Sequence, residues 1–427
     1  MNDPRRSRAR KRLRTLAVAA VGVIAAAAAV RFASFVAASA VRPSACFVTH
    51  YTLAHLLAEG KDLASSYDDP WFEAQTALVT PGVTDINVNP PTTALLLLPL
   101  AALSYTGARI AWTAVSVVLL AVSIVWLVRE AALPGAWGLA FVGFALTYQP
   151  VIADFRFANA YVLVLALTVA AWHGYRTGND RLLGAALALM LAVKLAGGLL
   201  WLLALSERRW RAVAWGAAVA ASIAVGSLPW LGVHAWRADA GALASAVRRP
   251  ESAVTAYQSV SGFFRHLFAP DPAWNPAPLF SAPALASLGG WVALLAVIGA
   301  GLWVARSHPG DDRVFAAFVI AGVVISPMSL DYTYSALLLP AAVALAWVRE
   351  RGSPWTWVLV FAAVLPIAAY LPYWSPRLAN GAWALLAYPK LGGALFSGGN
   401  QQTYRVAYLF LRHTDARIGN QPGQHQR

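Results

Sequence analysis

Residues 182–205 read LLGAALALMLAVKLAGGLLWLLAL and contain a single charged side chain, that of Lys194. An apolar stretch of this length can cross the hydrocarbon core of a bilayer, which takes about 20 residues in a helix. A lysine within it must reach the interface, pair with an acid or bind an anion, because an isolated charge in hydrocarbon is costly. The stretch therefore predicts one membrane helix, or two half-helices, with a functional lysine.

The composition extends this interpretation to the whole chain. Of the 427 residues, 59% are hydrophobic and only 12% are charged, whereas an ordinary soluble domain has about 25% charged residues. A water-soluble fold cannot bury so large an apolar fraction, and the same figures exclude a disordered or collagen-like chain. The single cysteine, Cys46, excludes an intramolecular disulfide and a thiolate metal cluster.

Further apolar segments flank this one on both sides. We count ten to twelve membrane crossings, which makes the chain an all-α polytopic membrane protein. Several of the segments are shorter than the range of about 17–25 residues that a span needs, so tilted, broken or re-entrant helices are expected. The apolar segments cover residues 15–40, 92–105, 109–128, 133–149, 157–173, 182–205, 211–232, 284–305, 314–328, 333–348, 355–372 and 382–396.

The charges predict how the protein lies across the membrane. The net charge is +14, and much of it lies in residues 1–14, directly before the first apolar segment. Such a basic run is typical of a cytoplasmic terminus beside anionic lipid, so nucleic acid is not an expected partner. We therefore expect a membrane domain over 15–396 with external loops at about 42–90 and 234–283, and a cytoplasmic tail over 397–427.

The first external loop is acidic, with six of the chain's 19 acidic residues. A carboxylate at the outer membrane face could act as the general base that activates a sugar hydroxyl. Asp62, Asp68 and Asp69 are the candidates. The stretch from Asp68 to Trp71 is equally typical of a helix start, with aspartate as the cap and proline in the first turn.

Other polar residues lie at the ends of apolar segments. Arg156 could bind a lipid phosphate or pair with Asp154. Arg265 could bind a lipid phosphate through its guanidinium group, or it could lie on a solvated interfacial helix. Asp331 could cap a helix or line a polar cavity. The residues that we expect to line a substrate groove are Asn89, Asn159, Gln258, Asp331 and Tyr332.

Taken in order, these features resemble glycosyltransferase family 87, the polyprenyl-phosphate-mannose-dependent mannosyltransferase-like proteins of bacteria. The resemblance covers roughly residues 15–375. The residues that carry it are Asn89-Pro90-Pro91 with Pro99, Asn159, Lys194 followed by Arg208-Arg209-Trp210-Arg211, Gln258-Ser259 with Arg265, and Ser326-Pro327 with Ser329 and Pro340.

The resemblance implies a GT-C architecture and an inverting transfer of a hexose, often mannose, on the outer side of the bacterial plasma membrane. The donor would be a polyprenyl-phosphate-linked sugar and the acceptor an envelope glycan or glycolipid. No cofactor and no nucleotide-sugar site are expected, and a need for a divalent metal is left open. A carboxylate would be the base, and Arg265, Lys194 and Arg156 would bind the donor phosphate.

The sequence departs from the family pattern where the family usually has its acid, because Cys46 stands at that position. The base would then be Asp62, Asp68 or Asp69, with His50 as another candidate because its ordinary pKa is near neutrality. Loss of activity is the other interpretation. A transporter of lipid-linked saccharides, or a non-catalytic partner in envelope polysaccharide assembly, is the alternative function; related halves, which a transporter often has, are not evident.

Overall fold

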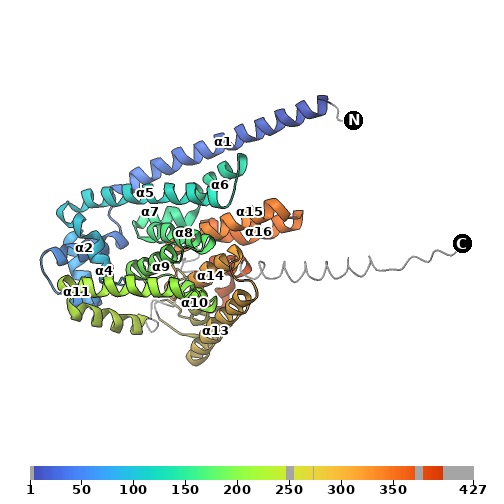
Figure 1. Ribbon diagram of the computed structural model, residues 1–427. Helices are drawn as coiled ribbons and strands as arrows, with labels where there is room; N and C mark the ends of the chain where they lie inside the picture. Colours follow the sequence, from blue (N-terminus) through green and yellow to red (C-terminus); the bar gives the residue numbers. More distant parts are fainter. Residues whose placement is uncertain (1–3, 247–253, 273, 371–377, 398–427) are drawn as a thin grey trace.

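The computed structural model describes residues 4–246, 254–272, 274–370 and 378–397; for residues 4–14, 246 and 351 it describes the backbone alone. All the regular elements in these ranges are helical, and the described residues form no strand beyond an isolated bridge between Asp271 and Asn275. The predicted all-α membrane protein is thereby confirmed (Figure 1). The basic side chains of the first 14 residues and the tail after residue 397 lie outside what the structure describes.

Five helices in the described part of the chain are long and apolar enough to cross a membrane. A sixth candidate is the pair α6 (Ala136–Thr147) and α7 (Gln149–Phe157), which is bent by 45°. In Figure 1, α1 and α5 run side by side along the long direction of the molecule, and the first part of α11 packs against α9 further down in this view. The five are α1 (Pro4–Ala40, apolar from Thr15), α5 (Tyr105–Glu130), α11 (Trp210–Ala246), α13 (Pro283–Ser307), and η4 (Asp331–Leu337) with α15 (Leu338–Arg351).

This count is lower than the ten to twelve crossings predicted, because several apolar segments form helices of fewer than 18 residues. These helices pack against other parts of the protein, where a short or broken helix is tolerated. The shorter ones are α8 (Tyr161–Thr177), α9 (Asp180–Lys194), α10 (Gly198–Ser206), α14 (Asp312–Ile325) and α16 (Pro354–Ala368).

The stretch 182–205 is two helices, one of the two forms predicted for it. Helix α9 ends at Lys194, and Leu195 and Gly197 then adopt left-handed backbone conformations with φ of 50° and 82°. Such a conformation is unusual for leucine and ends a helix. Helix α10 begins at Gly198. The break leaves Lys194 at a helix end and not in the middle of a span.

Residues 42–90, predicted to be the first external loop, fold into three short elements and an extended segment. Helix α2 (Ala45–Ala58) packs against α4 (Thr92–Leu97) and the following η2 (Leu98–Ala102). Between them lie η1 (Leu63–Tyr67) and α3 (Asp69–Val79). In Figure 1, α2 and α4 lie at the end of the bundle opposite the N-terminus.

The remaining elements follow α11, which is kinked at Gly232, where φ is 68°. Helix α12 (Val260–Phe268) packs against α13. Near the C-terminus, η6 (Gly381–Trp383) and α17 (Ala384–Ala387) precede a last helical segment over residues 389–397.

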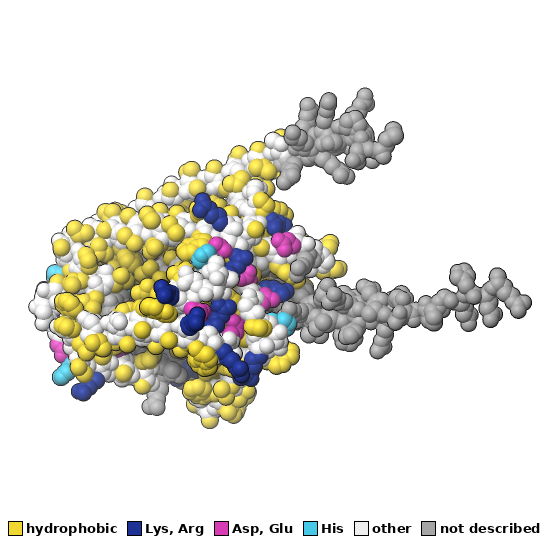
Figure 2. Space-filling model, viewed as in Figure 1, with side chains coloured by type: hydrophobic (Ala, Val, Ile, Leu, Met, Phe, Trp, Pro, Cys, Tyr) yellow, Lys and Arg dark blue, Asp and Glu magenta, His cyan; other side chains and the backbone are white. Residues whose placement is uncertain are grey.

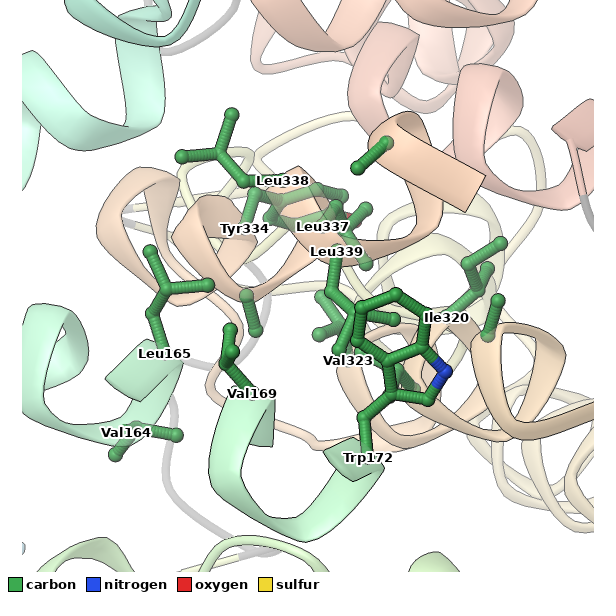
Figure 3. Close-up of a cluster of buried hydrophobic side chains, with 14 of the residues drawn as sticks. Val164, Leu165, Val169, Trp172, Ile320, Val323, Tyr334, Leu337, Leu338 and Leu339 are labelled. Carbon is green, nitrogen blue, oxygen red and sulfur yellow. The ribbon is translucent and has the colours of Figure 1, made fainter. Parts of the chain in front are cut away.

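The hydrophobic core joins α8, α14 and the η4–α15 segment. Figure 3 shows Trp172 and Val169 of α8 facing Val323 of α14 and Leu339 of α15. Trp172 also donates a hydrogen bond of 2.9 Å from its indole nitrogen to Asp312 at the start of α14. This packing places the first residue of α8, Tyr161, against Tyr332 in η4, with ring centroids 5.4 Å apart.

Charged side chains gather at one end of these helices. Glu130 at the end of α5 accepts hydrogen bonds from His173 at 2.9 Å and Arg176 at 3.0 Å, and Arg176 pairs with Asp312 at 3.2 Å. Figure 2 shows such side chains in the half of one face nearer the N-terminus, beside a largely hydrophobic surface. His173 and Arg176 lie near the end of α8, so this network is about 20 Å from Tyr161 at the other end of the helix.

Candidate functional site

A cavity of about 810 Å³ lies at the end of the bundle away from the charged network. The start of α2 and of α8, the end of α9, the part of α11 after Gly232 and the segment that follows α14 all contribute to its wall. The polar side chains that line it include Cys46, Thr49, His50, Tyr67, Asp85, Asn87, Asn89, Gln149, Arg156, Asn159, Tyr161, Lys194, Asp239, Asp331 and Tyr332.

Lys194 is held at the cavity wall by a neutral partner. Its ammonium donates a hydrogen bond of 2.6 Å to the side-chain oxygen of Asn89, and it lies 5.5 Å from the ring centre of Tyr161. Thr92 and Thr93, at the start of α4, donate hydrogen bonds to the carbonyls of Ala192 and Val193 at the end of α9. These contacts bring the Asn89-Pro90-Pro91 motif and Lys194 to the same place.

Asp85 is the carboxylate that faces this lysine from the extended segment between α3 and α4. One of its oxygens accepts a hydrogen bond of 2.9 Å from the Thr49 hydroxyl, and the other accepts one of 3.0 Å from the backbone N–H of Ile86. Burial raises the pKa of this carboxyl above its ordinary value, although the Thr49 bond and the Lys194 charge oppose the shift. A carboxylate with a raised pKa is a better proton acceptor than an exposed one.

Asp85 is one of the six acids in residues 42–90, but it was not among the predicted candidates for the base. The available signal was its position two residues before Asn87, where the motif of Asn89 begins. That signal is weak without the contact to Thr49, which lies on α2.

Cys46 lies in the first turn of α2 and lines the same cavity. Its thiol donates a hydrogen bond of 3.6 Å to the Tyr332 hydroxyl. Burial and the nearby Asp85 carboxylate raise the pKa of the thiol to about 12, so it stays protonated. The cysteine therefore supplies no base, while Asp85 supplies a carboxylate to the cavity that Cys46 lines.

His50 is fully buried one turn further along α2, with Asn89 and the backbone of Ala158 as polar neighbours of its ring. Burial and the Lys194 charge lower its pKa well below the ordinary value. A neutral imidazole of such low basicity is a poor proton acceptor, although it can still donate one hydrogen bond.

Arg109 holds the wall of the cavity together. It is fully buried on α5 and donates hydrogen bonds to the carbonyl of Ser39 at 3.2 and 3.0 Å and to that of Arg156 at 2.9 Å. A third donor reaches the hydroxyl of Ser44, the residue before α2. The end of α1, the start of α2 and the end of α7 are thereby fixed relative to one another, which places both Cys46 and Arg156.

The negative charge of Asp331 is compensated by Gln149 and Lys390. Gln149 donates a hydrogen bond of 2.7 Å to one of its oxygens, and the ammonium of Lys390 lies 3.6 Å from the other. Lys390 is fully buried and also donates to the Gln149 side chain at 3.1 Å and to the carbonyl of Ile367 at 2.7 Å. The helical segment 389–397 thus contributes a cation beneath the cavity wall.

A model of glycosyltransferase family 87 matches residues 87–330, more than half of the chain. The chain belongs to glycosyltransferase family 87. No curated protein and no solved structure matches the chain. Membership makes the protein a membrane glycosyltransferase, and the matched region contains Asn89, Arg156, Asn159 and Lys194, all of which line the cavity.

Seven of the twelve residues that the sequence indicated line the cavity of this family 87 protein. Asn89 and Lys194 touch directly, and Asn159, Tyr332 and Asp331 lie on the wall formed by the segments around α8 and η4. The full set is His50, Asn89, Arg156, Asn159, Lys194, Asp331 and Tyr332.

The other five residues lie elsewhere in the transferase. Asp62 and Asp68 are exposed, and their side chains cap η1 and α3 by accepting hydrogen bonds from Ala64 and Trp71. Asp69 is the first residue of α3 and does not line the cavity. The two remaining residues are Arg265 on α12, which lies near Asp271, and Gln258, which is buried against Thr255 and Ala387.

Proposed function

We propose that this protein transfers a hexose, with mannose as the first candidate, from a polyprenyl-phosphate donor to an envelope glycan or glycolipid at the outer face of the bacterial plasma membrane. The observation that carries the proposal is the presence of the Asp85 carboxylate and the Lys194 ammonium in one cavity. A transfer of this kind needs a base for the acceptor and a cation for the leaving group.

In this proposal, Lys194 binds the phosphate of the donor. Its partner Asn89 is neutral, so its positive charge is available to an anion. Arg156 also lines the cavity and is exposed, which suits a second contact to the phosphate. The bond between the anomeric carbon and the phosphate oxygen breaks, and both electrons leave with the polyprenyl phosphate, whose charge these cations stabilise.

Asp85 is the base that we assign. The acceptor oxygen attacks the anomeric carbon from the side opposite the phosphate, so the configuration at that carbon inverts. During the attack, the proton of the acceptor hydroxyl passes to the Asp85 carboxylate. Two other carboxylates line the cavity, but Asp331 is engaged by Gln149 and Lys390. Asp239 lies beside Tyr67 and is considered below.

The apolar part of the cavity suits the lipid tail of such a donor. Leu199 and Leu200 of α10, Leu294 of α13 and Phe318 and Val319 of α14 line it. A polyprenyl chain is purely hydrocarbon, so it would gain its binding energy by covering these side chains.

The test uses the purified full-length chain in lipid nanodiscs. Radiolabelled farnesyl-phosphate mannose is supplied as the donor with a panel of methyl glycosides as acceptors, and transfer is measured by product chromatography. We expect mannose transfer by the wild-type protein and none by Asp85→Asn. A protein that consumes no lipid-phosphate hexose, or that uses GDP-mannose instead, would overturn the proposal.

A further inference from the structure

A second carboxylate, Asp239, faces the cavity from the part of α11 that follows the kink at Gly232. Only 8% of Asp239 is exposed. Ala242 and Leu243 line the same cavity. Residues three and four positions apart share one face of a helix, so this face of α11 is turned toward the cavity.

Tyr67, at the end of η1, is a polar neighbour of Asp239, and the two side chains interact directly. The Tyr67 hydroxyl has one proton, for which the carbonyl of Asn89, at 2.9 Å, and the Asp239 carboxylate compete. No other side chain in the described part of the chain donates to Asp239. A largely buried carboxylate that shares its one donor with a carbonyl is incompletely satisfied, and a ligand hydroxyl would supply the missing hydrogen bond.

Asn89 connects this carboxylate to the cationic part of the cavity. Its backbone carbonyl accepts from Tyr67, while its side-chain oxygen accepts from Lys194 at 2.6 Å. Asn87, whose side-chain oxygen accepts from the backbone N–H of Asn89 at 2.9 Å, lines the same part of the wall. Asn89 therefore lies between the Lys194 ammonium and Tyr67, the neighbour of Asp239.

We propose that Asp239, Tyr67 and Asn87 form the subsite for the acceptor, and that this acceptor is a neutral carbohydrate rich in hydroxyl groups. The proposal rests on the proposed transferase function. A carboxylate has two oxygens that only accept hydrogen bonds, so it can bind two neighbouring hydroxyls of a sugar. The same charge repels an acceptor that carries a carboxylate or phosphate near the reacting hydroxyl.

The test compares methyl α-mannopyranoside with methyl glucuronide, which adds a carboxylate to the ring. Binding of each to the nanodisc protein is measured by saturation-transfer NMR, without any donor, for the wild type, Asp239→Asn and the matched control Asp68→Asn. Transfer from farnesyl-phosphate mannose is measured in parallel. Asp68 is exposed and does not line the cavity.

We expect Asp239→Asn to weaken binding of the neutral glycoside by about tenfold or more, the loss of a charge-assisted hydrogen bond. The preference for the neutral over the anionic glycoside should shrink, and the KM for the donor should not change. Tyr67→Phe keeps the aromatic ring and should weaken binding of the neutral glycoside by a smaller factor than Asp239→Asn does.

The subsite proposal would be overturned if Asp239→Asn bound the neutral glycoside as well as the wild type does, with the same preference over the anionic glycoside. It would also be overturned if the variant lost donor binding to the same extent as glycoside binding, because that result would indicate a structural role for Asp239. The two proposals fail separately. If the wild type never consumes a lipid-phosphate hexose, the transferase proposal fails, while the binding measurement still decides whether Asp239 recognises a neutral sugar.

Discussion

Lys194 and Asn89 lie 105 positions apart in the sequence, yet the lysine ammonium donates a hydrogen bond of 2.6 Å to the asparagine side chain. No described carboxylate forms an ion pair with this lysine. A neutral acceptor orients the ammonium without cancelling its charge, so the charge remains available to an anion that enters the cavity. The break after α9 makes this possible, because it places Lys194 at a helix end.

The first prediction concerns this charge. Lys194→Gln removes the cation but keeps a hydrogen-bond donor, so the KM for farnesyl-phosphate mannose should rise by about 10- to 100-fold, the loss expected for a hydrogen bond to a charged group. Lys194→Arg should retain most of the affinity. The control is Lys61→Gln, since Lys61 is exposed and pairs with Glu59. An unchanged donor KM in Lys194→Gln would remove the phosphate-binding role.

The second prediction concerns the base. Asp85→Asn should lower kcat by about 10²- to 10⁴-fold, the usual contribution of a general base. The control Asp62→Asn alters an exposed cap and should leave the transfer rate unchanged. Because burial disfavours the charged form of Asp85, the neutral asparagine should not lower the thermal unfolding temperature. Full activity in Asp85→Asn would assign the base elsewhere.

The third prediction concerns pH. The base works only when ionised, so kcat/KM should fall as the pH drops through the pKa of Asp85. That pKa is raised by burial and by Glu73, and lowered by Thr49 and Lys194, with a net increase. The acid limb should therefore lie at a higher pH than for an ordinary carboxylate. Stability has the opposite sign, since ionisation of Asp85 removes stability as the pH rises. Thr49→Val should move the acid limb higher still.

The fourth prediction concerns the C-terminal segment. Lys390→Met leaves Asp331 and Gln149 without their buried cation, and removing one partner of a buried pair costs about 3–5 kcal/mol. Thermal unfolding in nanodiscs should show a clear loss of stability. The double variant Lys390→Met with Asp331→Asn should recover part of it, because no charge is left unpaired. Equal stability of the single variant and the wild type would contradict this pairing.

The sequence by itself determined the class of protein and much of the polar side of the cavity. Hydropathy decides between membrane and water because it is a sum over residues, and it needs no knowledge of neighbours. Lys194, Asn89 and Asn159 could be selected because a polar residue among apolar ones is conspicuous along the chain. The break at Lys194 was foreseen as an alternative, because a charge is costly in the middle of a span.

The tertiary structure alone decided which acid faces the cavity. Asp62 and Asp68 are exposed acids, but the local hydrogen bonds that they accept from the backbone of Ala64 and Trp71 make them helix caps. Asp85 is turned inward by Thr49, which is 36 positions away. The partnership of Lys390 with Gln149 spans 241 positions. Contacts of this kind leave no periodic trace in the sequence.

The same reason explains the number of crossings. The hydropathy of an apolar segment is the same whether lipid or protein surrounds it, so residues 182–205 and 314–328 were predicted to be membrane spans. Packing against α11 and α8 lets such segments form the short helices α9, α10 and α14. The apolar character of a side chain determines that it avoids water. Only the neighbours that folding brings together determine whether lipid or protein then surrounds it.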